Sequence, residues 1–163
     1  YTPMKRRTHW ATEIGAIPGA FPPLVGWSAA TGQPDLGGWI LFAVLFFWQI
    51  PHFMAIAWMY RWDYALGGMP VRALHDQSGR AAALSSLIAA IVLVVLAIVG
   101  GVVGMTGVGF TVWGVLLSGW YGWKAWIFLR SEKPDADARS LFLASLVFLP
   151  AWFFPLLVDR LLF

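Results

Sequence analysis

The sequence predicts an all-α fold, a polytopic bundle of transmembrane helices. Of its 163 residues, 60% are hydrophobic and 12% are charged, and the mean hydropathy is +0.71. Soluble domains carry roughly 25% charged residues, so this chain has too few to cover its surface in water. Five apolar segments of about 20 residues, the length that crosses a bilayer as a helix, follow one another along the chain.

The predicted spans are interrupted by prolines at two places. The first span contains three prolines, and the fifth contains Pro150 and Pro155. Neighbouring helices or cavities can satisfy the carbonyl groups that proline frees, so kinked helices in a bundle are expected. Small residues at Gly114, Ser118 and Gly122 predict close packing of the fourth span against another helix. The spans lie near residues 13–30, 37–60, 82–104, 108–129 and 140–158.

Basic residues predict the orientation of the spans. Lys and Arg occur in segments 1–12, 61–80 and 130–139, whereas the loop 31–36 and the turn around Thr106 have none. Positively charged loops stay in the cytoplasm, so the three basic segments are predicted to be cytoplasmic and the C-terminus to lie on the other side.

Composition also excludes several classes of function. The chain has no cysteine, which rules out disulfides, thiolate metal sites and a cysteine nucleophile. The basic residues are scattered between apolar runs, so no nucleic-acid partner is expected.

The second span contains the polar residues Gln49 and His52 in an otherwise apolar stretch. Ionisable residues at membrane depth are costly and usually face a cavity or a partner. If the helix continues to Asp63, eleven residues further on, His52 and Asp63 share one face, roughly 16 Å apart along the axis. The alternative, that His52 merely bonds the backbone of a neighbouring helix, stays open.

The loop 61–80 mixes carboxylates with arginines. Carboxylates hold Mg²⁺ through oxygen, and arginine neutralises phosphate, so the mixture suits a metal–diphosphate site. The cations that precede the first span could contribute from the same side, with Lys5 close to Asp63. Taken alone, the charged residues of the loop 61–80 are also explained by a solvated loop, and the cations before the first span by a topology signal. The charged and polar residues of the loop are Arg61, Asp63, Arg72, His75, Asp76 and Arg80.

Four stretches resemble one known family. Residues 1–8, YTPMKRRT, resemble the Y-x-x-x-K-R stretch of the UbiA-type intramembrane prenyltransferases. Residues 15–27, GAIPGAFPPLVGW, residues 48–58, WQIPHFMAIAW, and residues 61–70, RWDYALGGMP, resemble runs of the protohaem IX farnesyltransferases, a branch of that superfamily. These strong matches span residues 1 to about 80, whereas residues 81–163 match only in hydrophobicity and helix count.

The resemblance implies nine spans around a central cavity, of which this chain holds about five, as the C-terminal part of one prenyltransferase domain (1–163). It implies transfer of farnesyl from farnesyl diphosphate to a vinyl group of haem b (protohaem IX), giving haem O for terminal oxidase assembly. The implied cofactor is Mg²⁺, and the implied location is a bacterial-type plasma (inner) membrane. The implied partners are farnesyl diphosphate, haem b, the lipid bilayer, and haem A synthase or oxidase assembly factors.

The resemblance also assigns site residues. Asp63 falls on the family's second acidic motif and is the expected catalytic residue and Mg²⁺ ligand, with further ligands from an N-terminal half that this sequence lacks. Aromatic residues of the second span are expected either to surround an allylic cation or to face lipid. The expected diphosphate-binding residues are Tyr1, Lys5, Arg6 and Arg61. The expected substrate-pocket residues are Gln49, His52 and Phe53. The aromatic residues are Phe46, Phe47, Trp48 and Phe53.

Two departures from the family pattern bear on activity. The family's first acidic motif, N-x-x-x-D-x-x-x-D, does not occur here, so the chain alone is expected to be inactive. Arg72 stands where the family has an apolar residue. Two alternatives remain: a UbiA-type enzyme acting on a quinone or chlorophyll precursor, disfavoured by residues 15–27 and 48–58, and a non-catalytic membrane subunit or transporter half.

Overall fold

The computed structural model describes residues 11–68, 76 and 78–162, and within them the chain is helical and contains no strand. This confirms the predicted all-α class. The helices are α1 (Ala11–Gly19), α2 (Phe21–Thr31), α3 (Leu36–Met59), α4 (Arg61–Leu66), α6 (Arg80–Val102), α7 (Val108–Leu129) and α8 (Pro134–Leu162).

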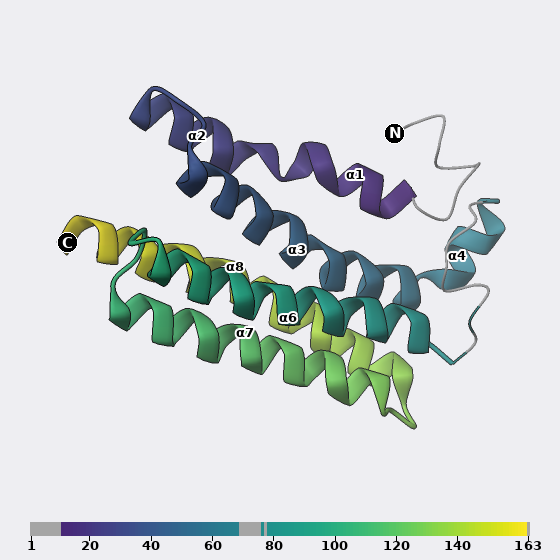
Figure 1. Cartoon of the computed structure of the whole chain (residues 1–163). Helices are drawn as coiled ribbons and strands as arrows, with labels where there is room; N and C mark the ends of the chain where they lie inside the picture. Colours follow the sequence, from purple (N-terminus) through teal and green to yellow (C-terminus); the bar gives the residue numbers. More distant parts are fainter. Residues whose placement is uncertain (1–10, 69–75, 77, 163) are drawn as a thin grey trace.

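Four long helices form the body of the protein. Helix α6 packs against α3 and α7, and α8 packs against the same two helices. Helices α1 and α2 lie along α3, at the edge of the bundle (Figure 1). Short turns join α6 to α7 and α7 to α8, so these neighbours run antiparallel.

The first predicted span is two helices. Helix α1 ends at Gly19, and α2 begins at Phe21 with two prolines in its first turn. Pro22 and Pro23 have no amide hydrogen, so the helical hydrogen-bond ladder cannot cross this point. Proline is nevertheless favourable in a first turn, where amides lack partners anyway. The prolines therefore end one helix and start the next instead of kinking a single span.

Three helices are long and apolar enough to cross a membrane, by length and composition: Leu36–Met59, Arg80–Val102 and Pro134–Asp159. The predicted fourth span, α7, falls outside this set, since it contains Lys124 and several glycines that lower its hydropathy. It packs alongside α6 and α8 in the bundle (Figure 1).

The turn between α6 and α7 is tied to the far end of α8. The Gly107 amide donates a hydrogen bond of 2.8 Å to Asp159 Oδ2, and Thr106 and Thr111 bond through their hydroxyl groups at 3.1 Å. The first amides of a helix have no partner within the helix, and a carboxylate is well suited to accept from them. Asp159 therefore closes the bundle at this end.

Small residues bring α6 and α7 close together, as the spacing in the fourth span predicts. A Cβ atom added to Gly114 would lie 3.1 Å from Ala97 Cβ and 3.2 Å from the Trp152 ring. One added to Gly122 would lie 3.4 Å from Ala90 Cβ. Helices without bulky side chains at the contact gain van der Waals packing through close approach of their backbones.

We expect Gly114→Ala to lower the stability of the protein by about 1–3 kcal/mol, because the added methyl group overpacks the α6–α7 contact. The matched control is Gly119→Ala in the same helix, where a Cβ would meet no atom within 4 Å. Alanine is the better helix former, so Gly119→Ala should be neutral or stabilising. Thermal unfolding in detergent measures both, and equal melting temperatures would contradict this account of the contact.

Candidate functional site

The junction between α3 and α4 places Asp63 at one end of the bundle. Tyr60 interrupts the helix, with φ −106° and ψ 21°, before α4 begins. The assumption of one continuous helix through residues 52–63 is therefore wrong. Helical spacing does not fix the relative orientation of His52 and Asp63, because the break changes the direction of the chain between them.

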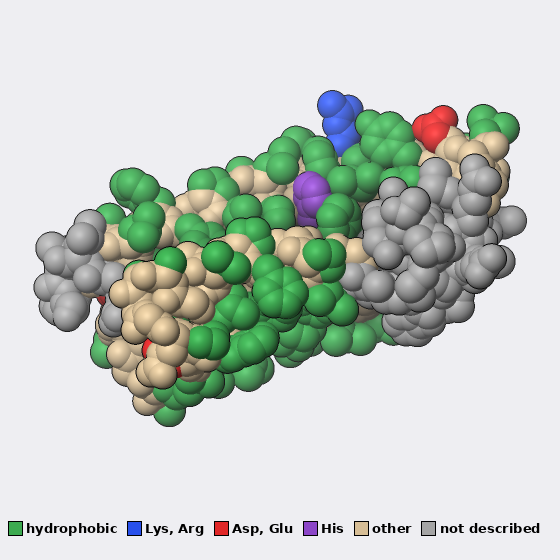
Figure 2. All heavy atoms as spheres, turned by 90° about the horizontal axis from the view of Figure 1, so that it is seen from above, with side chains coloured by type: hydrophobic (Ala, Val, Ile, Leu, Met, Phe, Trp, Pro, Cys, Tyr) green, Lys and Arg blue, Asp and Glu red, His purple; other side chains and the backbone are tan. Residues whose placement is uncertain are grey.

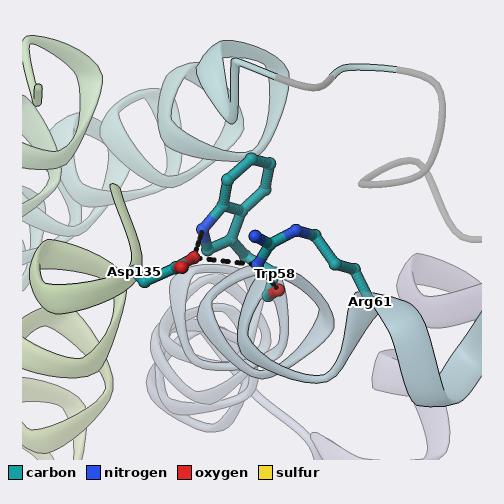
Figure 3. A network of polar contacts seen from close by, with 3 residues as sticks. All are labelled: Trp58, Arg61 and Asp135. Atoms are coloured by element: carbon teal, nitrogen blue, oxygen red, sulfur yellow. Dashed lines mark hydrogen bonds and ion pairs between the residues drawn. The ribbon is translucent and has the colours of Figure 1, made fainter. Parts of the chain in front are cut away.

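Three side chains hold this junction against α8 (Figure 3). Asp135 Oδ1 accepts hydrogen bonds from Trp58 Nε1 at 2.9 Å and from Arg61 Nη1 at 2.8 Å. The same Nη1 also donates to the Trp58 carbonyl at 2.8 Å. The guanidinium lies over the buried Trp58 ring, with 4.2 Å between Arg61 Cζ and the ring centre. We name Trp58, Arg61 and Asp135 the Asp135 clamp.

The Asp135 clamp joins three elements. Arg61 satisfies a carbonyl near the end of α3, where the interrupted helix leaves backbone acceptors without partners. Asp135 lies in the first turn of α8, where a carboxylate also interacts favourably with the helix dipole. Because α4 begins at Arg61, the clamp sets where α4 leaves α3 and hence where Asp63, two residues further on, is held.

The two carboxylates of the loop 61–80 differ in their surroundings. Asp76 accepts hydrogen bonds from the Ala81 amide at 2.6 Å and from the amide and hydroxyl of Ser78. It therefore supports the beginning of α6. The Asp63 side chain is exposed and makes no hydrogen bond or ion pair within the part of the chain that the structure describes. Asp63 is the carboxylate left available for a ligand.

The surroundings of Asp76 also shift its acidity. Burial by itself raises the pKa of this carboxyl. The hydrogen bonds from Ala81 and Ser78, together with the charge of Arg80, outweigh burial and bring the pKa below its usual value. Asp76 is thus held as a carboxylate for its role at the start of α6.

Several predicted site residues lie outside the described residues. The predicted approach of Lys5 to Asp63 stays a prediction for this reason. The residues concerned are Tyr1, Lys5 and Arg6 before the first helix, and Arg72 and His75 in the loop.

His52 contacts α8 from its position in α3. Its Nδ1 lies 2.8 Å from the hydroxyl oxygen of Ser145, and its ring lies 5.2 Å from the rings of Trp48 and Phe142, between centres. Phe53 approaches the imidazole edge-on at 5.5 Å. In the space-filling view, histidine atoms lie among hydrophobic side chains (Figure 2). They belong to His52, because His52 is the only histidine among the described residues.

The Ser145 hydroxyl lies within hydrogen-bond distance of two groups, Nδ1 of His52 at 2.8 Å and the Phe142 carbonyl at 2.5 Å. A hydroxyl can donate or accept, so the His52–Ser145 contact is compatible with either tautomer of the imidazole. In both cases Nδ1 is engaged, and Nε2 forms no hydrogen bond within the described residues. The observed partner of His52 is a side chain of α8 and not a backbone group, and its role toward a substrate stays a prediction.

Gln49 lies on a different side of α3. It is buried, and its Nε2 donates to the carbonyl groups of Ala16 at 3.4 Å and Leu45 at 3.2 Å. Its amide also fills the space beside Gly19, where a Cβ would meet Gln49 Oε1 at 2.6 Å. Gln49 therefore packs against α1, whereas His52 packs against α8.

Three contributors to the site were not predicted from sequence. Trp58 and Ser145 stand in apolar runs. Asp135 stands in the segment 130–139, where the basic residues were the basis for the predicted orientation. The sequence signal for such residues is a single hydroxyl or carboxylate group beside an apolar run. This signal does not identify the residue with which the group forms a hydrogen bond.

The described residues fit a metal site in part. They contain no group of three or more His, Asp or Glu side chains placed to hold an ion. Asp63 supplies one free carboxylate, and Mg²⁺ is commonly held by one or two carboxylates together with substrate phosphates and water. The donor present is thus of the right kind for a site completed by substrate and by other parts of the protein.

An all-helical bundle with three helices long and apolar enough to cross a membrane defines an integral membrane protein. Residues 1–147 match the UbiA prenyltransferase family, and the chain belongs to that family.

Curated relatives carry a more particular name. Proteins named protoheme IX farnesyltransferase are 46% identical in Opitutus terrae, over 99% of this chain and 55% of the relative, and 41% identical in Solibacter usitatus, over 98% and 54%. The mitochondrial protein of that name in Arabidopsis thaliana is 40% identical over 98% of this chain and 37% of its own length. The chain spans about half the length of these bacterial relatives. No solved structure matches it.

We expect the Asp135 clamp to be energetically coupled. In a double-mutant cycle of Asp135→Ala and Trp58→Phe, the interaction energy should be about 1 kcal/mol, because each change leaves the other partner without its hydrogen bond. Glu132→Ala is the matched control, since this nearby acid is exposed and has no partner within the described residues. Strictly additive effects on unfolding in detergent would contradict the clamp.

Proposed function

We propose that the native protein transfers a farnesyl group from farnesyl diphosphate to a vinyl group of haem b, giving haem O. The observation that carries the proposal is the free carboxylate of Asp63, held at the end of the bundle by the Asp135 clamp in a chain of the UbiA prenyltransferase family. The name shared by the curated relatives supports haem as the acceptor.

Ionisation of an allylic diphosphate develops negative charge on the leaving group, and the site has to stabilise that charge. Asp63 is the proposed ligand of Mg²⁺, and the metal when bound would supply electrostatic stabilisation of the departing diphosphate. Tyr1, Lys5 and Arg6 are proposed to bind the diphosphate. Arg61 is proposed to contribute its remaining N–H groups, since Nη1 already bonds Asp135 and the Trp58 carbonyl.

The farnesyl cation must be shielded from water while it forms. A row of rings along α3 is suited to this, with Phe42 and Phe46 stacked at 6.3 Å and Phe46 and Phe47 edge-to-face at 5.2 Å. These side chains are partly exposed, and aromatic faces attract cations. We propose that this face of α3 lies along the prenyl chain.

His52 is proposed to lie on the haem side of the pocket, with Phe53 beside it. Neutral imidazole with a free nitrogen is a common ligand of haem iron. The contact with Ser145 engages Nδ1, and Nε2 has no hydrogen-bond partner within the described residues. Gln49 has a role at the α1–α3 contact, and its proposed place in the substrate pocket rests on the family resemblance.

The proposed location is a bacterial inner membrane with residues 1–12 and the loop 61–80 in the cytoplasm, where diphosphate and Mg²⁺ are soluble. Positive loops favour this orientation. Haem A synthase or oxidase assembly factors remain predicted partners.

Asp63→Asn in the full-length protein should reduce haem O formation in membranes by about 10²–10³-fold, while the protein still folds, because the carboxylate acts on charge in the transition state. Asp76→Asn is the matched control. Asparagine can replace aspartate at the start of a helix, so activity should be retained. Near-normal activity of Asp63→Asn would exclude the assigned role, and turnover of a quinone or chlorophyll precursor instead of haem b would favour the other prenyltransferase reading.

His52→Gln should weaken haem binding by at least about tenfold, measured by titrating haem into the purified full-length protein and following its absorption band. Ser145→Ala should have a smaller effect of the same sign, because groups that orient a ligand tune affinity. Ser118→Ala is the control, since Ser118 is a buried hydroxyl with no partner in the described structure. Unchanged affinity in His52→Gln would place haem elsewhere.

A further inference from the structure

A groove of about 380 Å³ runs between α7 and α8 near the end of the bundle that holds Asp63. Its polar end is formed by Lys124 of α7 with Arg139 and Ser140 of α8. Its apolar part is lined by Trp120, Leu143 and Val147, which lie further along the two helices. The groove thus has a cationic end and a hydrocarbon end.

The two cations of the groove lack a carboxylate partner. Lys124 Nζ donates to Ser140 Oγ at 3.2 Å and lies 5.4 Å from the centre of the Trp123 ring, and Arg139 forms no ion pair within the described residues. Neighbouring acids on α8 are engaged elsewhere, since Asp135 belongs to the Asp135 clamp and Asp137 accepts from the Ser131 hydroxyl. Both cations are therefore open to an anion from outside the chain.

Both cations lie at the same depth. Lys124 is five residues before the end of α7 and Arg139 is five residues after the start of α8, so each is roughly 7–8 Å inside its helix end. Charges at this depth are unfavourable in hydrocarbon and direct their ends toward the lipid headgroups. Lipid phosphate is the anion available at that level of a membrane.

The groove is separate from the candidate site. Phe142 and Ser145 of α8 face His52, whereas Ser140, Leu143 and Val147 line the groove on the side of α7. At 100° per residue these two sets lie on well-separated faces of the helix. An occupant of the groove therefore does not compete for the proposed haem pocket.

We propose that the α7–α8 groove binds one anionic phospholipid, with its phosphate between Lys124 and Arg139 and an acyl chain along Trp120, Leu143 and Val147. Basic pockets between membrane helices bind anionic headgroups in this way. Lys124 and Ser140 orient the phosphate, while Arg139, which is exposed, can close over it. The lipid fixes α7 against α8 at the end of the bundle where the Asp135 clamp begins.

The test is native mass spectrometry of the purified full-length protein, titrated with phosphatidylglycerol or with phosphatidylcholine of identical acyl chains. The wild-type protein should bind phosphatidylglycerol more tightly than phosphatidylcholine. Lys124→Gln with Arg139→Gln should weaken that binding about tenfold to thirtyfold, since each basic residue near the surface contributes appreciably to anionic lipid binding. Equal binding of the two lipids by the wild type, or unchanged binding by the variant, would overturn the proposal.

The matched control is Arg130→Gln with Lys133→Gln, which removes the same charge from the neighbouring loop at the same end. It should keep the preference for phosphatidylglycerol. A variant with Lys124→Arg and Arg139→Lys keeps both charges and should bind, which separates loss of charge from loss of folding. Inorganic phosphate at the lipid concentration should not displace the lipid, and full displacement would indicate a phosphate site instead.

Discussion

The arrangement of this protein depends on one constraint: where a helix ends, its last backbone amides and carbonyls have no partner within the helix and take one from a side chain elsewhere or from water. Arg61 donates to the Trp58 carbonyl at the α3–α4 junction, and Asp76 accepts from the Ala81 amide where α6 begins. Asp159 accepts from Gly107 at the α6–α7 turn. Gln49 bonds the last turns of α1, next to the break that the prolines cause.

This constraint separates structural polar residues from residues left available for chemistry. Gln49, Asp76 and most of Arg61 are engaged with backbone groups or with the Asp135 clamp. Asp63 and Nε2 of His52 have no partner in the described part of the chain. The Asp63 carboxylate is thus available for a ligand, because the contacts that attach α4 to the bundle are made by Arg61 and not by Asp63.

The same end of the bundle combines two kinds of electrostatic site. Around Asp63 the chain presents a carboxylate, suited to a metal ion with a diphosphate. Between α7 and α8 it presents Lys124 and Arg139, which are suited to a lipid phosphate. Asp135 lies between Lys124 and Arg139 in sequence but pairs with Arg61, so its carboxylate contributes to the α3–α4 junction and not to the groove.

The sequence by itself determined the helical membrane class, three of the five predicted spans and the family, because apolar length and local motifs are properties of contiguous residues. It also singled out Asp63 and His52 as candidate site residues, and their roles stay predictions. The tertiary structure decided that residues 13–30 form two helices and that the chain breaks at Tyr60. It also supplied Asp135 and Ser145 as partners for Arg61 and His52, which stand 74 and 93 residues away. Such pairings arise from packing between helices, and no periodicity within one helix specifies which residue of another it will meet.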